Sequence, residues 1–156
     1  TTTVELEADA FIPPSYIVNE QQKLDIYKRI AGVETHAESE DMKEELLDRF
    51  GEVPKSVDNL LRIALIRVLA HELYITEVKG RNGELKITMR PDANLKGENL
   101  PVILGKHKNK LTFSARGTPV FFYRYKKCGV VEKDAENLIR LTEGLLADMK
   151  EILAGN

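Results

Sequence analysis

The sequence has no tryptophan, a single cysteine and three histidines, and the scarcity of cysteine and histidine argues against disulfide-bonded and metal-binding proteins. Cys128 cannot form a disulfide within the chain, so a reducing cytoplasm is the expected location. It also has no histidine near it in the sequence, which indicates an unreactive thiol rather than a nucleophile. The histidines, His36, His71 and His107, lack the close spacing of a metal-binding motif, so neither a metal nor another cofactor is expected in this chain.

The motifs of common catalytic sites are absent as well. The chain contains no GxxxxGK[ST] phosphate loop, no GxGxxG, no HExxH and no CxxC. No apolar run approaches the length of a membrane span, and no signal peptide opens the chain. The net charge of −2 predicts neither a nucleic-acid-binding nor a membrane-binding protein. What remains, 42% hydrophobic and 31% charged residues, is typical of one soluble globular domain.

The most distinctive segment runs from Ser39 to Pro54 and predicts a short helix with an acidic outer face. Ser39 is the expected N-cap, Gly51 the expected stop, and Pro54 is well placed to open the next helix. Arg49 follows Glu45 by four residues, the favourable order for a helical ion pair. The residues expected to face inward are Met42, Leu46, Leu47 and Phe50. The acids on the other side, at i, i+3, i+4 and i+7, are Asp41, Glu44, Glu45 and Asp48.

This acidic face has three possible explanations. An acidic row on a helix is most often solvated surface. A functional alternative is a docking surface for a basic partner, where charge sets orientation and selectivity. Acid–base catalysis is the weakest explanation, because it needs a carboxyl group whose pKa is raised, and carboxylates on an exposed row are mostly hydrated.

Hydrophobic periodicity predicts the other elements. Alternation over residues 4–12 predicts a strand, which the following prolines end. Asn19 is the expected N-cap of a helix that closes at Gly32, and residues 54–73 predict a helix that is apolar nearly all round. The inner face of the Asn19 helix is expected to carry Leu24, Tyr27, Ile30 and Ala31. The remaining expected elements are a hairpin of 75–79 and 85–89 around Asn82-Gly83, a short helix or turn near 100–104, a second hairpin of 111–114 and 120–125, and a long helix over 133–153.

This order of elements predicts an α+β fold. The chain is expected to form one domain over residues 1–156, with a strand-and-helix subregion over 1–74 and a hairpin-and-helix subregion over 75–156. Because a strand pattern begins almost at once and no methionine precedes it, the chain is expected to be a fragment of a longer protein.

Residues 96–127 reverse the sign of the charge and interleave aromatic side chains with basic ones. The segment contains a single acid, Glu98. Its basic residues are Lys96, Lys106, Lys108, Lys110, Arg116, Arg124, Lys126 and Lys127. The aromatic residues are Phe113, Phe121, Phe122, Tyr123 and Tyr125. A nucleic-acid-binding module would use such a pattern. The simpler explanation, which the sequence favours, is that the aromatic residues pack a core while the lysines keep the other face of the strands hydrated.

Four short motifs follow one another in the first half of the chain. They are Asp9, Ala10, Ile12, Pro13, Tyr16 and Ile17 in the pattern DA-x-IP-x-x-YI, then IYKRIA from Ile26 to Ala31, EL-x-DRFG-x-x-P from Glu45 to Pro54, and NLL from Asn59 to Leu61. In this order they resemble the C-terminal (TRCF) domain of the bacterial transcription-repair coupling factor family, Mfd. The match is dense from Val4 to Leu73 and thin afterwards, and Asn19 stands where an acid is common in the family.

The resemblance implies a regulatory module without a motor or a catalytic residue. The parent protein of the family is a DNA translocase that uses ATP and Mg²⁺ upstream of this domain, removes stalled RNA polymerase and recruits nucleotide excision repair. In the family this domain packs against an N-terminal module similar to UvrB and thereby hides the surface that recruits UvrA. The family's contact positions fall on Glu45, Asp48 and Arg49 of this chain, and further contacts are expected from Asp41, Glu44 and Glu52.

Overall fold

A computed structural model describes residues 1–153, and these fall into two units. The helical unit comprises Asp9–Val68, and the sheet unit comprises Thr1–Ala8 together with the described residues from Leu69 onward. The N-terminal strand belongs to the sheet unit because it pairs with a strand that follows residue 74. None of the helices in the described part of the chain is both long enough and apolar enough to span a bilayer.

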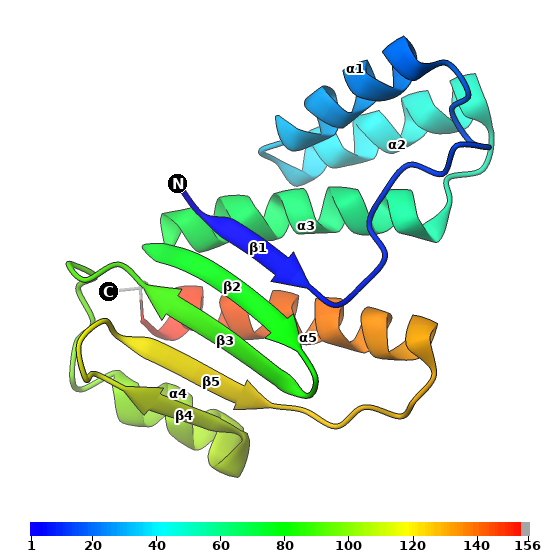
Figure 1. Ribbon diagram of the computed structural model, residues 1–156. Helices are drawn as coiled ribbons and strands as arrows, with labels where there is room; N and C mark the ends of the chain where they lie inside the picture. Colours follow the sequence, from blue (N-terminus) through cyan, green and yellow to red (C-terminus); the bar gives the residue numbers. More distant parts are fainter. Residues whose placement is uncertain (154–156) are drawn as a thin grey trace. The chain divides into compact units, whose positions relative to one another are not determined.

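Five strands form one mixed sheet in the sheet unit (Figure 1). They are β1 (Thr3–Leu6), β2 (Ile75–Arg81), β3 (Glu84–Met89), β4 (Leu111–Ser114) and β5 (Val120–Arg124), in the spatial order β1-β2-β3-β5-β4. β1 runs parallel to β2, and all other pairs are antiparallel. Both predicted hairpins are confirmed. The turn between β2 and β3 places Asn82 at φ 51° and Gly83 at φ 81°, the positive angles that an Asn-Gly turn tolerates.

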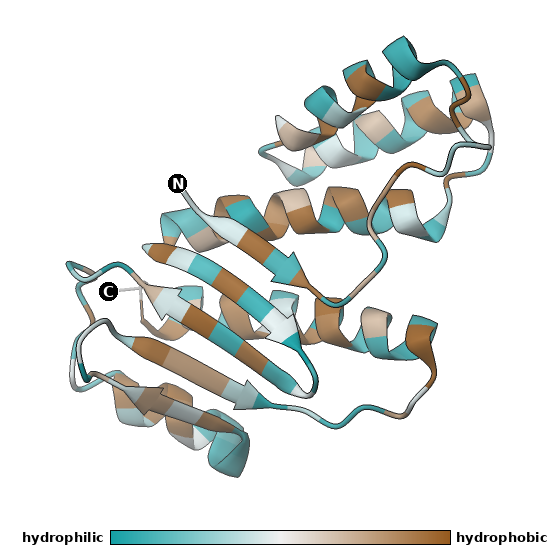
Figure 2. Cartoon of the chain, in the orientation of Figure 1, coloured by the Kyte–Doolittle hydropathy of each residue, from teal (hydrophilic) through white to brown (hydrophobic). Residues whose placement is uncertain are grey.

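Two helices complete the sheet unit. α4 (Leu100–His107) is followed by a 3₁₀ turn, η1 (Lys108–Lys110), and α5 (Val131–Ile152) lies along one face of the sheet (Figure 1). The strands alternate hydrophobic and hydrophilic residues (Figure 2), so that Leu85, Ile87 and Met89 of β3 are buried between half-exposed neighbours. The apolar stripe of α5 covers them with seven buried residues, which are Ala135, Leu138, Ile139, Thr142, Leu145, Leu146 and Met149.

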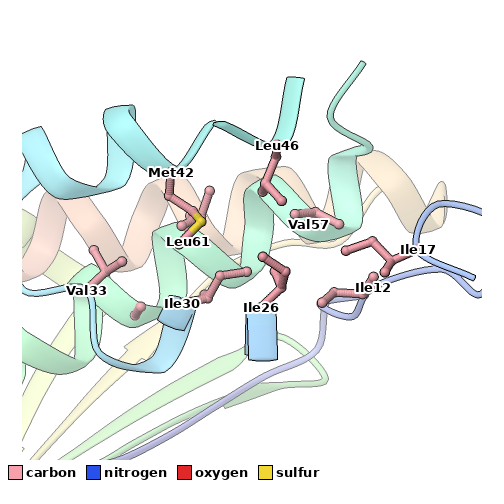
Figure 3. Packing of buried hydrophobic residues seen from close by; sticks show 10 residues of the cluster. Ile12, Ile17, Ile26, Ile30, Val33, Met42, Leu46, Val57 and Leu61 are labelled. Atoms are coloured by element: carbon pink, nitrogen blue, oxygen red, sulfur yellow. The ribbon is translucent and has the colours of Figure 1, made fainter. Parts of the chain in front are cut away.

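The helical unit consists mainly of α1 (Glu20–Ala31), α2 (His36–Phe50) and most of α3 (Lys55–Glu72), through Val68. Figure 3 shows its core, in which buried side chains of the three helices meet those of the preceding segment. The core residues are Ile12, Ile17, Ile26, Ile30, Val33, Met42, Leu46, Val57, Leu61 and Ala64. Asn19 caps α1 as predicted, since its side-chain oxygen accepts a hydrogen bond of 2.9 Å from the Gln22 N–H.

Two element boundaries differ from the sequence-based prediction. The first strand ends at Leu6, and Ile12 instead packs in the helical core, where its N–H donates to the Tyr27 hydroxyl at 2.8 Å. α2 begins at His36, because Thr35 and Glu38 form a capping box that satisfies two backbone N–H groups. Ser39, the predicted cap, lies inside the helix and is 3% exposed.

The inward faces of α1 and α2 were also predicted partly wrongly. α1 buries Ile26 and Ile30, which stand one turn apart, whereas Leu24 is 52% exposed. α2 buries Met42 and Leu46, whereas Leu47 is 57% exposed. One residue turns a helix by about 100°, so Leu47 falls outside the stripe that its neighbour joins.

Candidate functional site

The residues predicted to form the site lie on and just after α2, and the structure separates them into two groups. The first group consists of exposed acids. We call Asp41, Glu44 and Asp48 the acidic row, because they follow one another along the outward side of α2. Glu52 is exposed beyond the end of the helix. Among the described residues, none of these four carboxylates forms an ion pair with a basic side chain, so the acidic row is open to a partner.

The second group is an ion-paired cluster around Glu45, which we call the Glu45 clasp. Arg29 of α1 donates from Nη1 to Oε2 and from Nη2 to Oε1, both at 2.6 Å, in a bidentate arrangement. Arg49 donates from Nη1 to Oε2 at 2.8 Å, which is the ion pair that the spacing predicts. The two bonds from Arg29, and then the one from Arg49, lower the pKa of Glu45 to about 2. The charge of Glu45 is therefore neutralised by neighbours from the same unit.

Arg49 connects the clasp to the end of α2. Its guanidinium carbon lies 4.9 Å from the centre of the Phe50 ring, and that ring lies 5.9 Å from the Tyr16 ring. The Tyr16 hydroxyl lies within hydrogen-bonding distance of two backbone carbonyls, 2.9 Å from that of Gly51 and 3.2 Å from that of Leu46. Gly51 has φ 92° and ψ −167°, a conformation that is essentially limited to glycine. The DRFG segment thus fixes the end of the helix as well as presenting charge.

The motifs of the first half of the chain meet in this one network. Tyr16 joins the first motif to the DRFG segment, and Arg29 joins the IYKRIA segment to Glu45. The Asn59 side chain donates from Nδ2 to the carbonyl of Asp9 at 2.9 Å, which ties the NLL segment to the start of the first motif. Most of these motif residues therefore serve the architecture of the helical unit.

Sequence reasoning did not identify Arg29 as a member of the site. Arg29 lies in the last turn of α1, sixteen residues before Glu45. No local spacing rule links two residues on different helices, because only the packing of α1 beside α2 brings them together. The sequence offered one signal, which is that Arg29 belongs to the IYKRIA motif and that the next predicted helix is rich in acids.

The opposite flank of α2 is also paired. Lys43 Nζ lies 3.2 Å from a Glu40 carboxylate oxygen and 3.1 Å from one of Asp58 on α3. Both sides of α2 are therefore held by ion pairs to neighbouring helices, and the acidic row runs between them. No group of three or more His, Cys, Asp or Glu side chains within residues 1–153 is arranged to hold a metal ion.

The Glu45 clasp predicts an acid-sensitive contribution to stability. The pKa of Glu45 is about 2 in the folded chain against an ordinary 4.5, so the contribution is complete above pH 4.5 and is lost as the pH falls toward 2. The full shift corresponds to about 3 kcal/mol, and screening of a carboxylate that is one-third exposed reduces this to about 1–2 kcal/mol. Urea unfolding at a series of pH values between pH 7 and pH 2 measures this contribution to the free energy of unfolding.

Glu45→Gln is expected to flatten the pH profile of stability below pH 4.5, whereas the control Glu44→Gln is expected to preserve it. Equal profiles for the two variants would contradict the role of the clasp.

Comparison with known proteins places these features in a family. The family model described as "TRCF domain" matches residues 6–100. A transcription-repair-coupling factor of Borreliella burgdorferi is 33% identical over 130 residues, which are 83% of this chain and 12% of that protein. The factor of Bacillus subtilis is 34% identical over 93 residues, which are 60% of this chain and 8% of that protein. The chain thus spans an eighth or less of the length of these two relatives.

The fold has a counterpart among solved structures. A crystal structure described as the C-terminal domain of transcription-repair coupling factor superposes with a TM-score of 0.76. The two chains are 24% identical, and the match covers 96% of this chain and 94% of the other. The α+β arrangement predicted from the sequence is confirmed by this likeness, including the second half of the chain, where the motifs are few.

Proposed function

Because this chain belongs to the TRCF domain family, we propose that it is an autoinhibitory module of a transcription-repair coupling factor. In this proposal the acidic row docks on the UvrB-like N-terminal module of the same protein and masks the surface that recruits UvrA. The module performs no chemistry itself, and the ATP- and Mg²⁺-dependent motor lies elsewhere in the parent. The observation that carries the proposal is the row of exposed, unpaired carboxylates between two flanks whose charges are already paired.

The proposal gives the contact to other acids than Glu45. The resemblance implies that Glu45 is a contact position, but both of its carboxylate oxygens already accept bonds from Arg29. Asp48 and Glu44 are therefore the acids that would bind basic side chains of the UvrB-like module. Arg49 shares the Glu45 carboxylate with Arg29 and donates to it from Nη1, so its guanidinium group would also attract an acid of the partner.

Shape and an exposed apolar side chain add to this charge pattern. A shallow groove of about 300 Å³ lies beside the clasp between α1 and α2, and it is lined in part by Arg29, Glu38 and Asp41. Leu47 stands three residues after Glu44 and is exposed, so a partner could cover it while pairing with the acidic row.

The expected strength of this contact suits a switch. Exposed ion pairs contribute about 0–1 kcal/mol each, so a few of them form an interface that is released easily. Moving a two-state equilibrium from mostly closed to mostly open takes about 5.5 kcal/mol of differential binding. Engagement of DNA, ATP or RNA polymerase by other parts of the parent would supply that energy and expose the UvrA-binding surface.

The proposal is tested in the full-length factor by reversing the charge of the row. Glu44→Lys/Asp48→Lys is expected to raise the affinity for UvrA about tenfold, because two ion pairs that hold the closed state become repulsive. The measurement is titration of the full-length protein with UvrA. The matched control is Glu98→Lys/Glu151→Lys, which reverses two exposed acids of the sheet unit and is expected to leave the affinity unchanged. An unchanged affinity in a folded Glu44→Lys/Asp48→Lys protein would refute the assignment.

A further inference from the structure

A second surface, independent of the acidic row, lies in the sheet unit. It is an open groove of about 870 Å³ at the end of the sheet where β2 turns into β3 and where β5 ends. The two chain segments are joined there, because the Tyr125 N–H donates to the Gly83 carbonyl at 2.9 Å. The η1 turn and α5 supply the other walls. Its volume lies within the range of sites that hold a small ligand or a short segment of a longer one.

The groove gathers cations that form no ion pair within residues 1–153. Lys110, Arg124 and Lys126 line it, all three are exposed, and none of them forms an ion pair among the described residues. Other basic residues of the 96–127 segment are used internally, as Lys106 binds Asp148 and Lys127 binds Glu7. Glu84 is the only acid that lines the groove in the part of the chain that the structure describes. The groove therefore carries an excess of positive charge that attracts a polyanion.

The rest of the lining offers rings and amides. Two tyrosines lie at the wall, but Tyr123 is only 8% exposed and its ring packs edge-on against His107, with the ring centres 5.6 Å apart. The half-buried Tyr125 is therefore the more accessible of the two, and burial raises the pKa of both hydroxyls. Side-chain amides come from Asn82, Asn109 and Asn137, and each amide can both donate and accept a hydrogen bond.

The aromatic residues of this segment thus divide between two roles. Phe121 is buried, and its ring lies 4.7 Å from that of Phe113 within the sheet unit. The packing explanation that the sequence favoured therefore accounts for these two residues. Tyr123 is likewise buried, whereas Tyr125, half-buried just after β5, borders the open groove.

We propose that this groove binds a short segment of single-stranded nucleic acid. Lys110, Arg124 and Lys126 would bind the phosphates, the Tyr125 ring would contact a base, and the asparagine amides would bond to base edges. Cations alone would serve an acidic peptide equally well. The combination of cations with amides and an aromatic ring favours a ligand that carries bases as well as negative charge. This function is separate from autoinhibition, since it uses the sheet unit and no residue of the acidic row.

The test is fluorescence anisotropy of the complete chain with a labelled ten-nucleotide DNA strand at several salt concentrations. Binding is expected, and the logarithm of affinity should fall against the logarithm of salt with a slope of about −2, because three phosphates are neutralised. Arg124→Glu/Lys126→Glu is expected to lower the affinity about tenfold or more. Glu84→Gln is expected to raise it about twofold, because it removes the one carboxylate of the groove.

The matched control is Lys96→Glu/Arg116→Glu, which makes the same charge change at two exposed positions outside the groove. It is expected to change the affinity by less than about threefold, because it alters the net charge of the chain but no residue of the groove. Circular dichroism verifies that both double variants are folded. Absence of binding at 50 mM salt, or equal losses in the two double variants, would overturn the proposal. If thymidine monophosphate competes as strongly as the unlabelled strand, the groove is a free-nucleotide site and the proposal is overturned. If a polyglutamate peptide competes as strongly as the strand, the ligand is an acidic protein and the proposal is likewise overturned.

Discussion

Replacing Glu45 with lysine is expected to lower the free energy of unfolding by about 2–3 kcal/mol, although the substitution changes a helix surface. The reason is the Glu45 clasp, in which this carboxylate accepts two bonds from Arg29 and one from Arg49. A lysine there would place a third cation beside two guanidinium groups and leave them unpaired. Urea unfolding of the complete chain at pH 7, followed by circular dichroism, measures the change.

The control for this result is the same charge reversal one turn away. Asp48→Lys changes an exposed carboxylate that forms no ion pair among the described residues, so the stability is expected to change by less than about 0.5 kcal/mol. Equal losses in the two variants would show that any charge reversal on α2 is harmful and that the clasp has no special role. A binding defect of a Glu45 variant must therefore be corrected for its loss of stability, whereas one at Asp48 needs no such correction.

Leu46→Ala is expected to destabilise the chain by about 2–5 kcal/mol, because it opens a cavity in the core of the helical unit. Leu46 is fully buried there, and Figure 3 shows it beside Val57 in the interior between α2 and α3. Leu47→Ala is the matched control, since it removes the same atoms from the next residue, and the expected loss is below about 0.5 kcal/mol. Both variants are measured by urea unfolding. A loss at Leu47 equal to that at Leu46 would mean that Leu47 is covered in solution, which would remove it from the docking surface.

Local signals in the sequence were sufficient for most of the fold. The Asn82-Gly83 turn, the Asn19 cap and the long C-terminal helix each depend on residues within one or two turns of each other, and all three are present in the structure. The pairing of β1 with β2 could not be read in this way, because more than sixty residues separate the two strands. The start of α2 was misplaced for a different reason, since two candidate caps stand four residues apart and only Thr35 has a glutamate at the third following position.

The candidate site likewise combines features that depend on local spacing with features that depend on how distant segments pack. The i, i+3, i+4, i+7 spacing correctly placed the acidic row on the outward side of α2 and the Glu45–Arg49 pair on its surface. It could not reveal that Arg29 occupies Glu45, because that bond depends on how two helices pack. The sequence also could not predict the groove at the end of β5, because its lining comes from four separate segments of the chain.

The most direct test of the docking proposal is site-specific photo-cross-linking in the full-length factor. A photoreactive residue at position 48 is expected to cross-link to the UvrB-like module in the resting protein and to lose that cross-link when the motor engages DNA and ATP. The same probe at position 98, in the sheet unit, serves as the control. No cross-link from position 48 to that module, or one that persists unchanged in the engaged protein, would contradict a releasable contact through the acidic row.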